Sequence, residues 1–337
     1  MLRFLSSLFA ANQDEADGLP ETLLDAAIER AVEGTDRRLR ALGNYRKRLR
    51  EPVALAARHV IGLVRQLPEA TEISSVQYGG DPRLRAAFVS PEHLNEVLGR
   101  FWAIREYLEA HSDLPPDDIF GLLTMSRQER QVLGMELDGD TLKRDVLQTA
   151  VSFTDHRYLA PTDSERVTRR ELMKRAFDFL LEKALERMVA EKARRGDLAR
   201  ERQLLHRKLA ALKSGHWGLD TVFSETDEPT PRLEELEAEI EALEAELGRY
   251  GGIELGLEES LRHVMDTLGQ PEQWLALRSI RLNLDYRGIK AAESEAIEMS
   301  EIFSSNGQSR IVLFGRIPRA QLPAPKDTVK LGQAYLG

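Results

Sequence analysis

The spacing of apolar residues along the chain switches between two periods. From Leu19 to about Met125, apolar residues recur mainly every three or four positions, which is the spacing of amphipathic helices. Over residues 126–163 they alternate with polar residues, as in strands with one buried face. The helical spacing returns over 164–269, and the alternation resumes over 270–317. This order predicts a helical segment inserted between the strands of one β-domain.

The first alternating stretch predicts a β-hairpin. Its apolar positions are Leu133, Met135 and Leu137 on the outgoing strand and Leu147, Val151 and Phe153, with Thr149, on the returning strand. The sequence Asp138-Gly139-Asp140 between the two strands is typical of a tight turn. Pro115 and Pro116 predict a short helix just before the hairpin, so we expect the strands to begin after Met125.

The second alternating stretch predicts three further strands. Apolar residues alternate from Ile280 to Tyr286, and two more strand-like segments cover 297–304 and 310–317. Asn306-Gly307 separates the last two and favours a type I′ turn, whose two central residues need positive φ. Two strands before the helical segment and three after it are each too few for a stable free sheet. We therefore expect one antiparallel sheet of about five strands, either open or closed on itself.

The long helical segment changes character along its length. A wide apolar stripe runs through Met173, Phe177, Leu180, Ala184 and Met188. Beyond Gly196, a possible kink, the stripe narrows to Leu198, Leu205, Leu209 and Leu212, with Arg202 at one seam position. A wide stripe needs a large packing surface, whereas a narrow one is typical of the seam between two helices.

A second helix supplies the expected partner for that seam. Leu233, Leu236, Ile240, Leu243 and Leu247 are spaced three, four, three and four residues apart. The segment Lys183–Lys213 holds ten Lys or Arg residues and four acids, whereas Leu233–Leu247 holds seven Glu and no basic residue. Opposite charges favour pairing of the two helices within one chain over self-pairing of the acidic helix. We therefore predict an antiparallel coiled-coil hairpin.

These elements define an α+β fold, in which an N-terminal helical region precedes a small antiparallel β-domain of about five strands with a long antiparallel coiled-coil hairpin inserted between its strands. The predicted divisions are a flexible or amphipathic N-terminus (1–18), a helical region (19–125), the first part of the β-domain (126–163), the hairpin insertion (164–269), the second part of the β-domain (270–317) and an extended C-terminal tail (318–337).

Composition narrows the chemistry and the location. The chain has no cysteine, which excludes disulfides, thiolate metal sites and cysteine nucleophiles and fits a reducing compartment. A formal net charge of -9 argues against general affinity for nucleic acids. No apolar run has the length of a transmembrane helix, and the first eleven residues fit a signal peptide poorly. We expect a cytoplasmic protein.

Motifs for catalysis, metals or cofactors are missing from the sequence. The seven histidines do not share the spacing of a helix-borne metal site, and no phosphate-binding glycine loop or nucleophile elbow occurs. Asp155-His156 is the one adjacent acid and histidine pair at a strand end, but neighbouring strand residues point to opposite faces. We expect no metal and no cofactor, and the catalytic residues of any enzymatic activity stay unidentified.

A basic segment is the sharpest electrostatic feature. Seven positive charges without an acid occupy fourteen positions, at Arg37, Arg38, Arg40, Arg46, Lys47, Arg48 and Arg50. One interpretation is a binding site for anionic phosphate on a membrane lipid or nucleic acid. The other, which we favour, is that the segment contacts acidic helices of its own fold, with the acidic helix 233–247 as a ready partner.

Two apolar segments are candidates for contacts with partners. Residues between the two arms of the hairpin form a candidate partner-binding tip, namely Trp217, Leu219, Val222 and Phe223. The alternative is that they close the hairpin by packing on its own leucines. The N-terminal Leu2, Phe4, Leu5, Leu8 and Phe9 could lie in a lipid interface, pack on the helical region, or be disordered.

Three functions follow from these features. The first is a non-catalytic structural or adaptor protein that binds an unknown protein partner, or further copies of itself, through a projecting coiled-coil hairpin. The second is a peripheral binder of anionic phosphate surfaces through segment 37–50. The third is an enzyme of unidentifiable class, which we consider less favoured.

Overall fold

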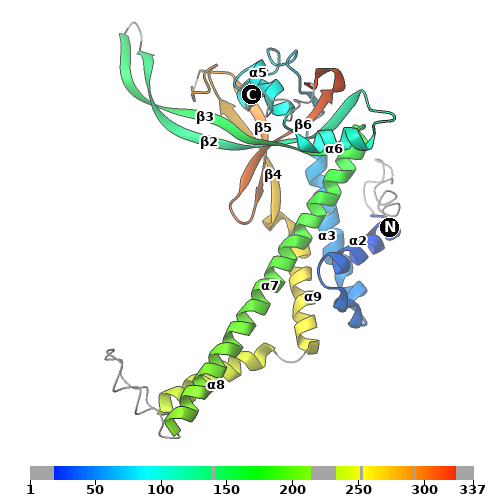
Figure 1. Ribbon diagram of the computed structural model, residues 1–337, viewed down its shortest axis with the longest axis vertical. Helices are drawn as coiled ribbons and strands as arrows, with labels where there is room; N and C mark the ends of the chain where they lie inside the picture. Colours follow the sequence, from blue (N-terminus) through cyan, green and yellow to red (C-terminus); the bar gives the residue numbers. More distant parts are fainter. Residues whose placement is uncertain (1–18, 139–140, 214–232, 251–252, 292, 324–337) are drawn as a thin grey trace, which may run out of the picture. The chain divides into compact units, whose positions relative to one another are not determined.

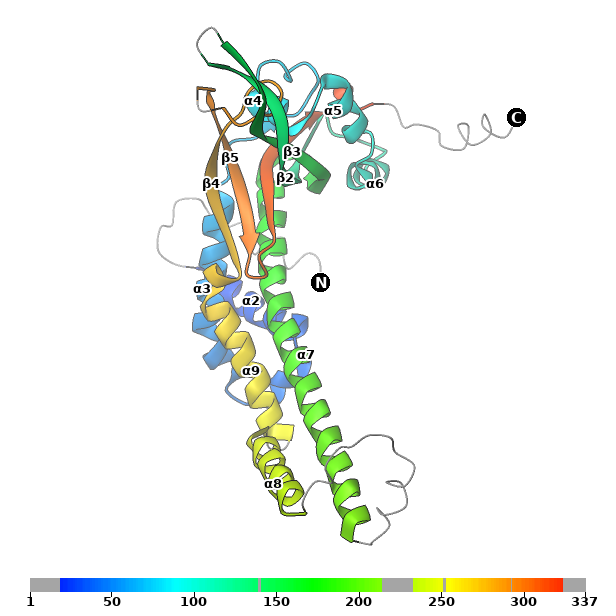
Figure 2. The same cartoon turned by 90° about the vertical axis from the view of Figure 1, so that its left-hand side faces the viewer.

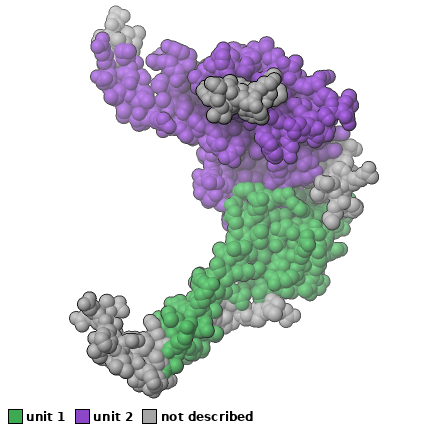
Figure 3. Space-filling view, viewed as in Figure 1, with its two compact units in different colours: residues 1–57, 178–270 green, residues 58–177, 271–337 purple. Residues whose placement is uncertain are grey.

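The computed structural model describes residues 19–138, 141–213, 233–250, 253–291 and 293–323. The chain forms two compact units, one of residues 1–57 with 178–270 and one of residues 58–177 with 271–337 (Figure 3). Each unit is discontinuous in sequence, because residues 58–177 separate the two parts of the first unit and residues 178–270 separate those of the second. The α+β fold class with a helical insertion is confirmed.

The second unit is built on a six-stranded sheet (Figure 1). Its strands are β1 (Thr71–Glu72), β2 (Asp118–Asp138), β3 (Thr141–Thr162), β4 (Leu275–Asn283), β5 (Ala296–Ser304) and β6 (Ser309–Pro318). The order is β3-β2-β6-β5-β4, with every neighbouring pair antiparallel, and the short β1 pairs in parallel with β6. The five expected strands are therefore present, and β1 is an addition.

The predicted helix after Pro115 is wrong, because β2 begins at Asp118. Its first eight residues pair with β6, from Asp118 opposite Pro318 to Met125 opposite Ile311. Leu122 is buried in the core on one face of the sheet, and Leu123 is buried in the core on the other. A strand buried on both faces has a continuous apolar run and no period of two, so the alternation in the sequence became visible only after Met125.

Helices of the same unit cover both faces of the sheet (Figure 2). One face packs on α4 (Pro82–Ala87), α5 (Pro91–Leu98) and α6 (Trp102–Ala110). The other face packs on the end of α3 (Tyr45–Arg65) and the start of α7 (Glu165–Lys213). The stretch 69–88 contains β1 and α4. Asp81 caps α4 by accepting a hydrogen bond from the Arg83 N–H at 2.8 Å.

The hairpin of β2 and β3 is interrupted by bulges. Asp145, Asp155 and Ala160 have left-handed φ values of 57°, 51° and 52°. Each lies at a shift in the β2–β3 register, where β3 has an additional residue. Such bulges bend a strand and reset the alternation of its side chains. The predicted alternation from Leu147 to Phe153 is correct because it falls between two bulges, and the predicted turn at 139–140 lies outside the described residues.

Tyr158 bridges the two strands β2 and β6. Its hydroxyl lies 3.0 Å from the carbonyl oxygens of both Ile119 and Gly315, on β2 and β6. Full burial raises the pKa of Tyr158 well above its ordinary value, so the hydroxyl stays a donor. The ring occupies the space next to Gly121, where a Cβ atom would lie 2.2 Å from the Tyr158 Cε1 atom.

The first unit is helical. It contains α2 (Glu21–Gly34), the short 3-10 helix η1 (Arg37–Ala41), the first part of α3, most of α7, α8 (Leu233–Tyr250) and α9 (Ile253–Gly269). Two further 3-10 turns, η4 (Pro271–Gln273) and η5 (Arg319–Gln321), belong to the second unit. Leu181 packs so closely on Gly34 that a Cβ there would lie 2.8 Å from its Cδ1.

Two expectations about these helices change. A proline favours the first turn of a helix, but α3 begins at Tyr45 and continues through Pro52. A proline removes one helical hydrogen bond, and the burial of Leu49 and Val53 on either side of it stabilises the helix. Gly196 does not interrupt α7, which is helical throughout. None of the helices in the described ranges has both the length and the apolar character of a membrane span.

We predict that Gly121→Ala lowers the stability of the second unit. The new methyl group would collide with the buried Tyr158 ring, and overpacking of this kind costs about 1–3 kcal/mol. Urea denaturation followed by tryptophan fluorescence measures the change.

Gly62→Ala is the matched control, because Gly62 lies inside α3 with no atom within 4 Å of the new Cβ. That variant should gain about 0.5–1 kcal/mol from helix propensity. Equal effects of the two substitutions would contradict the close packing of Tyr158 on Gly121.

Candidate functional site

The basic segment lies on η1 and the first turns of α3, where acids of the same unit neutralise most of its charge. Five of its seven cations form ion pairs, which are Arg38–Asp36, Arg40–Glu29, Arg46–Glu29, Arg48–Glu258 and Arg50–Glu21. Arg37 and Lys47 are exposed and have no ion pair within the described ranges. The acids come from α2, α9 and the residue before η1, whereas the sequence had pointed to the acidic helix α8.

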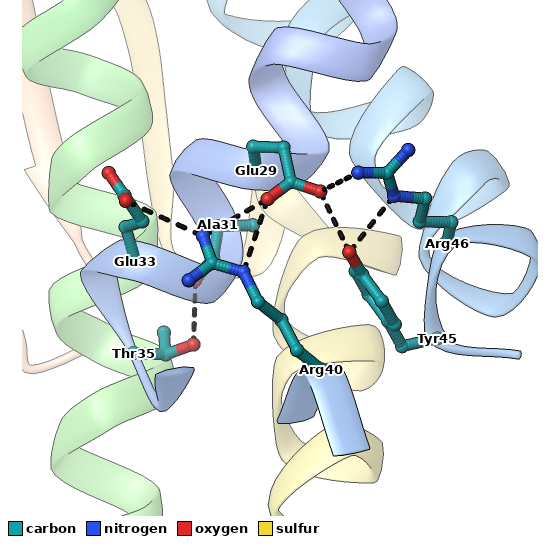
Figure 4. A network of polar contacts seen from close by, with 7 residues as sticks. All are labelled: Glu29, Ala31, Glu33, Thr35, Arg40, Tyr45 and Arg46. Carbon is teal, nitrogen blue, oxygen red and sulfur yellow. Dashed lines mark hydrogen bonds and ion pairs between the residues drawn. The ribbon is translucent and has the colours of Figure 1, made fainter. Parts of the chain in front are cut away.

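Glu29 is the centre of this network (Figure 4). Its carboxylate accepts a hydrogen bond from the Tyr45 hydroxyl at 2.8 Å and pairs with Arg46 at 2.8 Å and Arg40 at 3.0 Å. Partial burial raises the pKa of Glu29, but the hydrogen bonds from Tyr45 and Arg40 and the charge of Arg46 more than offset it, so the pKa lies below its ordinary value. Glu29 therefore ties α2 to η1 and α3.

The predicted seam between α7 and α8 is present. Leu205 of α7 packs with Leu236, Ile240 and Leu243 of α8 in a separate buried cluster, and Leu198 and Leu209 lie against it. Beside the seam, the His206 Nε2 atom lies 3.2 Å from the Glu244 Oε1 atom. The structure does not describe the side chains of Leu212, Leu233 and Leu247. Nor does it describe the four residues of the predicted tip, Trp217, Leu219, Val222 and Phe223. The coiled-coil geometry of the pair stays a prediction.

A polar cleft of about 390 Å³ lies between α7 and α9 in the same unit. Lys192 and Arg195 line it from α7, and Ser260 and His263 line it from α9. The ion pairs at its walls are long, with 3.9 Å between Lys192 and Asp36 and 3.8 Å between Arg195 and Glu259. A cleft with charges of both signs can accept a small polar ligand.

His263 is the histidine that lines this cleft. Its Nδ1 atom is buried and has no hydrogen-bond partner. Burial, and secondarily the charge of Arg187, lowers the pKa of His263, so the ring is neutral at neutral pH. Within the described ranges, His, Asp and Glu form no group of three that could hold a metal ion.

Asp155 and His156 have separate hydrogen-bond partners. The bulge turns the Asp155 carboxylate towards Arg157, at 3.0 Å, and Arg310, at 2.7 Å. The His156 ring stacks on Phe88 with 4.9 Å between centroids and binds the Ala87 carbonyl through Nε2 at 2.9 Å. Burial lowers the pKa of His156, which fits a neutral packed ring.

An apolar surface on the β2–β3 hairpin was missed as a candidate site. Leu133, Met135 and Leu147 were expected to form a buried strand face, but they are 69%, 56% and 66% exposed. The signal was present in the length of the alternating stretch, which exceeds what the remaining strands could cover.

Comparison of the chain with protein-family models, with curated proteins and with solved structures finds no match. By its fold, the chain is an α+β protein with a helical insertion in an antiparallel sheet.

We predict that Glu29→Gln destabilises the first unit by about 1 kcal/mol at neutral pH, because charge-assisted hydrogen bonds from three partners are weakened. The pKa of Glu29 is lower in the folded protein than in the unfolded chain. Its contribution is therefore complete above the unfolded value of about 4.3 and is lost as pH falls through the folded value. Denaturation curves of both proteins between pH 3 and pH 7 should converge at the acid end.

Glu33→Gln is the control on the same helix, since Glu33 has one contact with Arg40, at 3.4 Å. Its effect should stay below about 0.5 kcal/mol. A deficit of Glu29→Gln that persisted unchanged at acid pH would rule out the electrostatic origin.

Proposed function

We propose that this protein is a non-catalytic structural or adaptor protein of the cytoplasm that binds a protein partner through its α7–α8 hairpin. The α7–α8 seam carries this proposal. Leu205, Leu236 and Ile240 bury each other, and exposed charged residues such as Glu237, Glu239 and Glu241 surround them. These residues of the hairpin are thus covered by one another, and segment 214–232 connects the two helices in the sequence.

Three of the described histidines support a non-catalytic role. His59 and His156 bind main-chain carbonyls at 2.7 Å and 2.9 Å, and His206 flanks the α7–α8 seam. Each of these rings holds two parts of the fold together. Their geometry favours a structural use over proton transfer.

The test places a photo-crosslinking amino acid at Trp217 or Phe223 of the full-length chain in its native cells. We expect one adduct of discrete mass at both positions, because the proposal assigns the partner contact to this segment. Excess wild-type protein should compete for the adduct, and the double variant Trp217→Ser, Phe223→Ser should not. Denaturing electrophoresis and mass spectrometry measure the adduct.

Val76 is the control position, since it is apolar, 71% exposed and belongs to the other unit. Labels there should give no such adduct. Adducts that were equal at all three positions, or that the double variant competed for as well as wild type, would refute binding through the hairpin tip.

The alternative function is binding of an anionic phosphate surface. The exposure of Arg37 and Lys47 is the observation that favours it. Both are exposed, and neither has an ion pair within the described ranges. This alternative predicts that Arg37→Glu with Lys47→Glu abolishes retention on vesicles containing phosphatidylserine, and that salt weakens wild-type retention steeply. Co-sedimentation with these vesicles measures retention.

The control changes the same charge elsewhere, at the exposed Arg65 and Arg262. If both double variants bind equally well, the retention reflects overall charge and not the basic segment. Wild-type protein that fails to sediment with the vesicles rejects the alternative for lipid.

A further inference from the structure

The outer part of the β2–β3 hairpin is a two-stranded ribbon. β2 pairs with β6 only as far as Met125, and residues 126–138 pair with β3 alone. Figure 1 shows these two strands continuing past the other strands of the sheet. Two strands are marginally stable in water by themselves, and strands of 21 and 22 residues are far longer than usual. Pairing with a further strand would therefore stabilise the ribbon.

The outer edge of β3 already has a partner near the base of the ribbon. The Val151 N–H donates to the Gly288 carbonyl at 2.8 Å, and the Lys290 N–H donates to the Thr149 carbonyl at 2.9 Å. Ala150 and Ile289 form a bridge between these bonds. Segment 285–291 thus covers β3, whereas the described part of β2 beyond Met125 has no partner on its other side.

The orientation of the free groups on β2 follows from these bonds. Because Val151 and Thr149 direct their main-chain groups away from β2, Ala150 between them faces β2 and is bonded to its partner Arg130. Antiparallel strands alternate, so the N–H and C=O groups of Glu129, Gln131 and Leu133 lie on the open edge. This edge is a ready template for another strand.

The side chains beside that edge are apolar on one face. Leu133 lies directly opposite Leu147, and Met135 lies two residues further on the same face. All three are more than half exposed. The same face of β3 continues into Val151 and Phe153, which are buried in the core of the unit. An apolar stripe thus leaves the core and becomes exposed along the ribbon.

We infer that a second copy of this chain pairs antiparallel with β2 along the open edge, about a two-fold axis at Val132. The charges of the strand argue against two of the other registers. An axis at Arg130 or Glu129 would set like charges against each other, which destabilises cross-strand pairs. With the axis at Val132, Arg130 faces Gly134 and Glu129 faces Met135 of the second copy.

The same register places the apolar residues together. Val132 faces Val132 of the second copy on one face. On the other face, Leu133 of each copy lies diagonally beside the other, with Met135 and Leu147 next to them. The result is a four-stranded ribbon in which both copies use one surface, as a two-fold interface requires.

The absence of cysteine allows a direct test of the register. Val132→Cys introduces a single thiol at a position that the inferred pairing sets opposite itself without main-chain bonds between them, where Cα atoms are about 4.5 Å apart. This separation suits a disulfide. We expect Val132→Cys to form a disulfide-linked dimer on mild oxidation of the full-length protein at micromolar concentration.

Arg130→Cys is the matched control on the same strand. In the inferred register residue 130 faces residue 134 of the second copy, so the two thiols are four residues apart, or about 13 Å. This distance is too long for a disulfide. Cross-linking of Arg130→Cys as fast as Val132→Cys would overturn the register.

Light scattering of the unmodified protein tests the association itself. We expect a dimer mass, and Leu133→Lys should weaken the dimer about tenfold or more by placing like charges together at the open edge. Leu114→Lys, at an 87% exposed leucine outside the ribbon, should leave the mass unchanged. Circular dichroism checks that both variants are folded.

A wild-type protein that stays monomeric at the highest concentration tested would overturn the inference, and would leave the edge to a strand from a different protein. A dimer that Leu133→Lys does not weaken would also overturn it, because the contact would then lie elsewhere. The Val132→Cys result stands independently of how well Leu133→Lys folds.

Discussion

The pairing of β2 with β6 is the interaction on which the remaining structure depends. Eight residues from Asp118 to Met125 pair with Ile311 to Pro318, and the whole helical insertion lies between these two strands in sequence. Strands from before and after the insertion therefore become neighbours in one sheet. Tyr158 reinforces this contact by bonding to a carbonyl oxygen on each strand. Without this pairing, β3 and β2 would be separated from β6, β5 and β4.

Much of this fold could be predicted from the sequence, because its strongest patterns are local. The strands from Ile280 to Ile317 and the seam of Leu236, Ile240 and Leu243 follow from regular spacing. The start of β2 could not be predicted, since a strand buried on both faces shows no alternation. The bulges at Asp155 and Ala160 were also invisible, because left-handed backbone is not encoded there by glycine.

The candidate sites were harder to predict, because their meaning depends on partners distant in sequence. The charge run from Arg37 to Arg50 has the composition of a phosphate site, yet Glu21, Glu29 and Glu258 pair with its arginines. Conversely, Leu133 and Met135 have the pattern of an ordinary core strand but lie exposed. The local sequence shows which residues are charged or apolar, but only the tertiary structure shows which residues surround them.

The position of β6 near the end of the chain has a consequence for synthesis. β3 ends at Thr162 and β6 begins at Ser309, so the ribosome makes both ribbon strands long before their partner in the sheet. At about 5–20 residues per second this interval is roughly 7–30 s. Throughout that time the edge of β2 that later receives β6, from Asp118 to Met125, has no strand partner on the nascent chain. Chaperone binding during translation is therefore expected to concentrate on this segment.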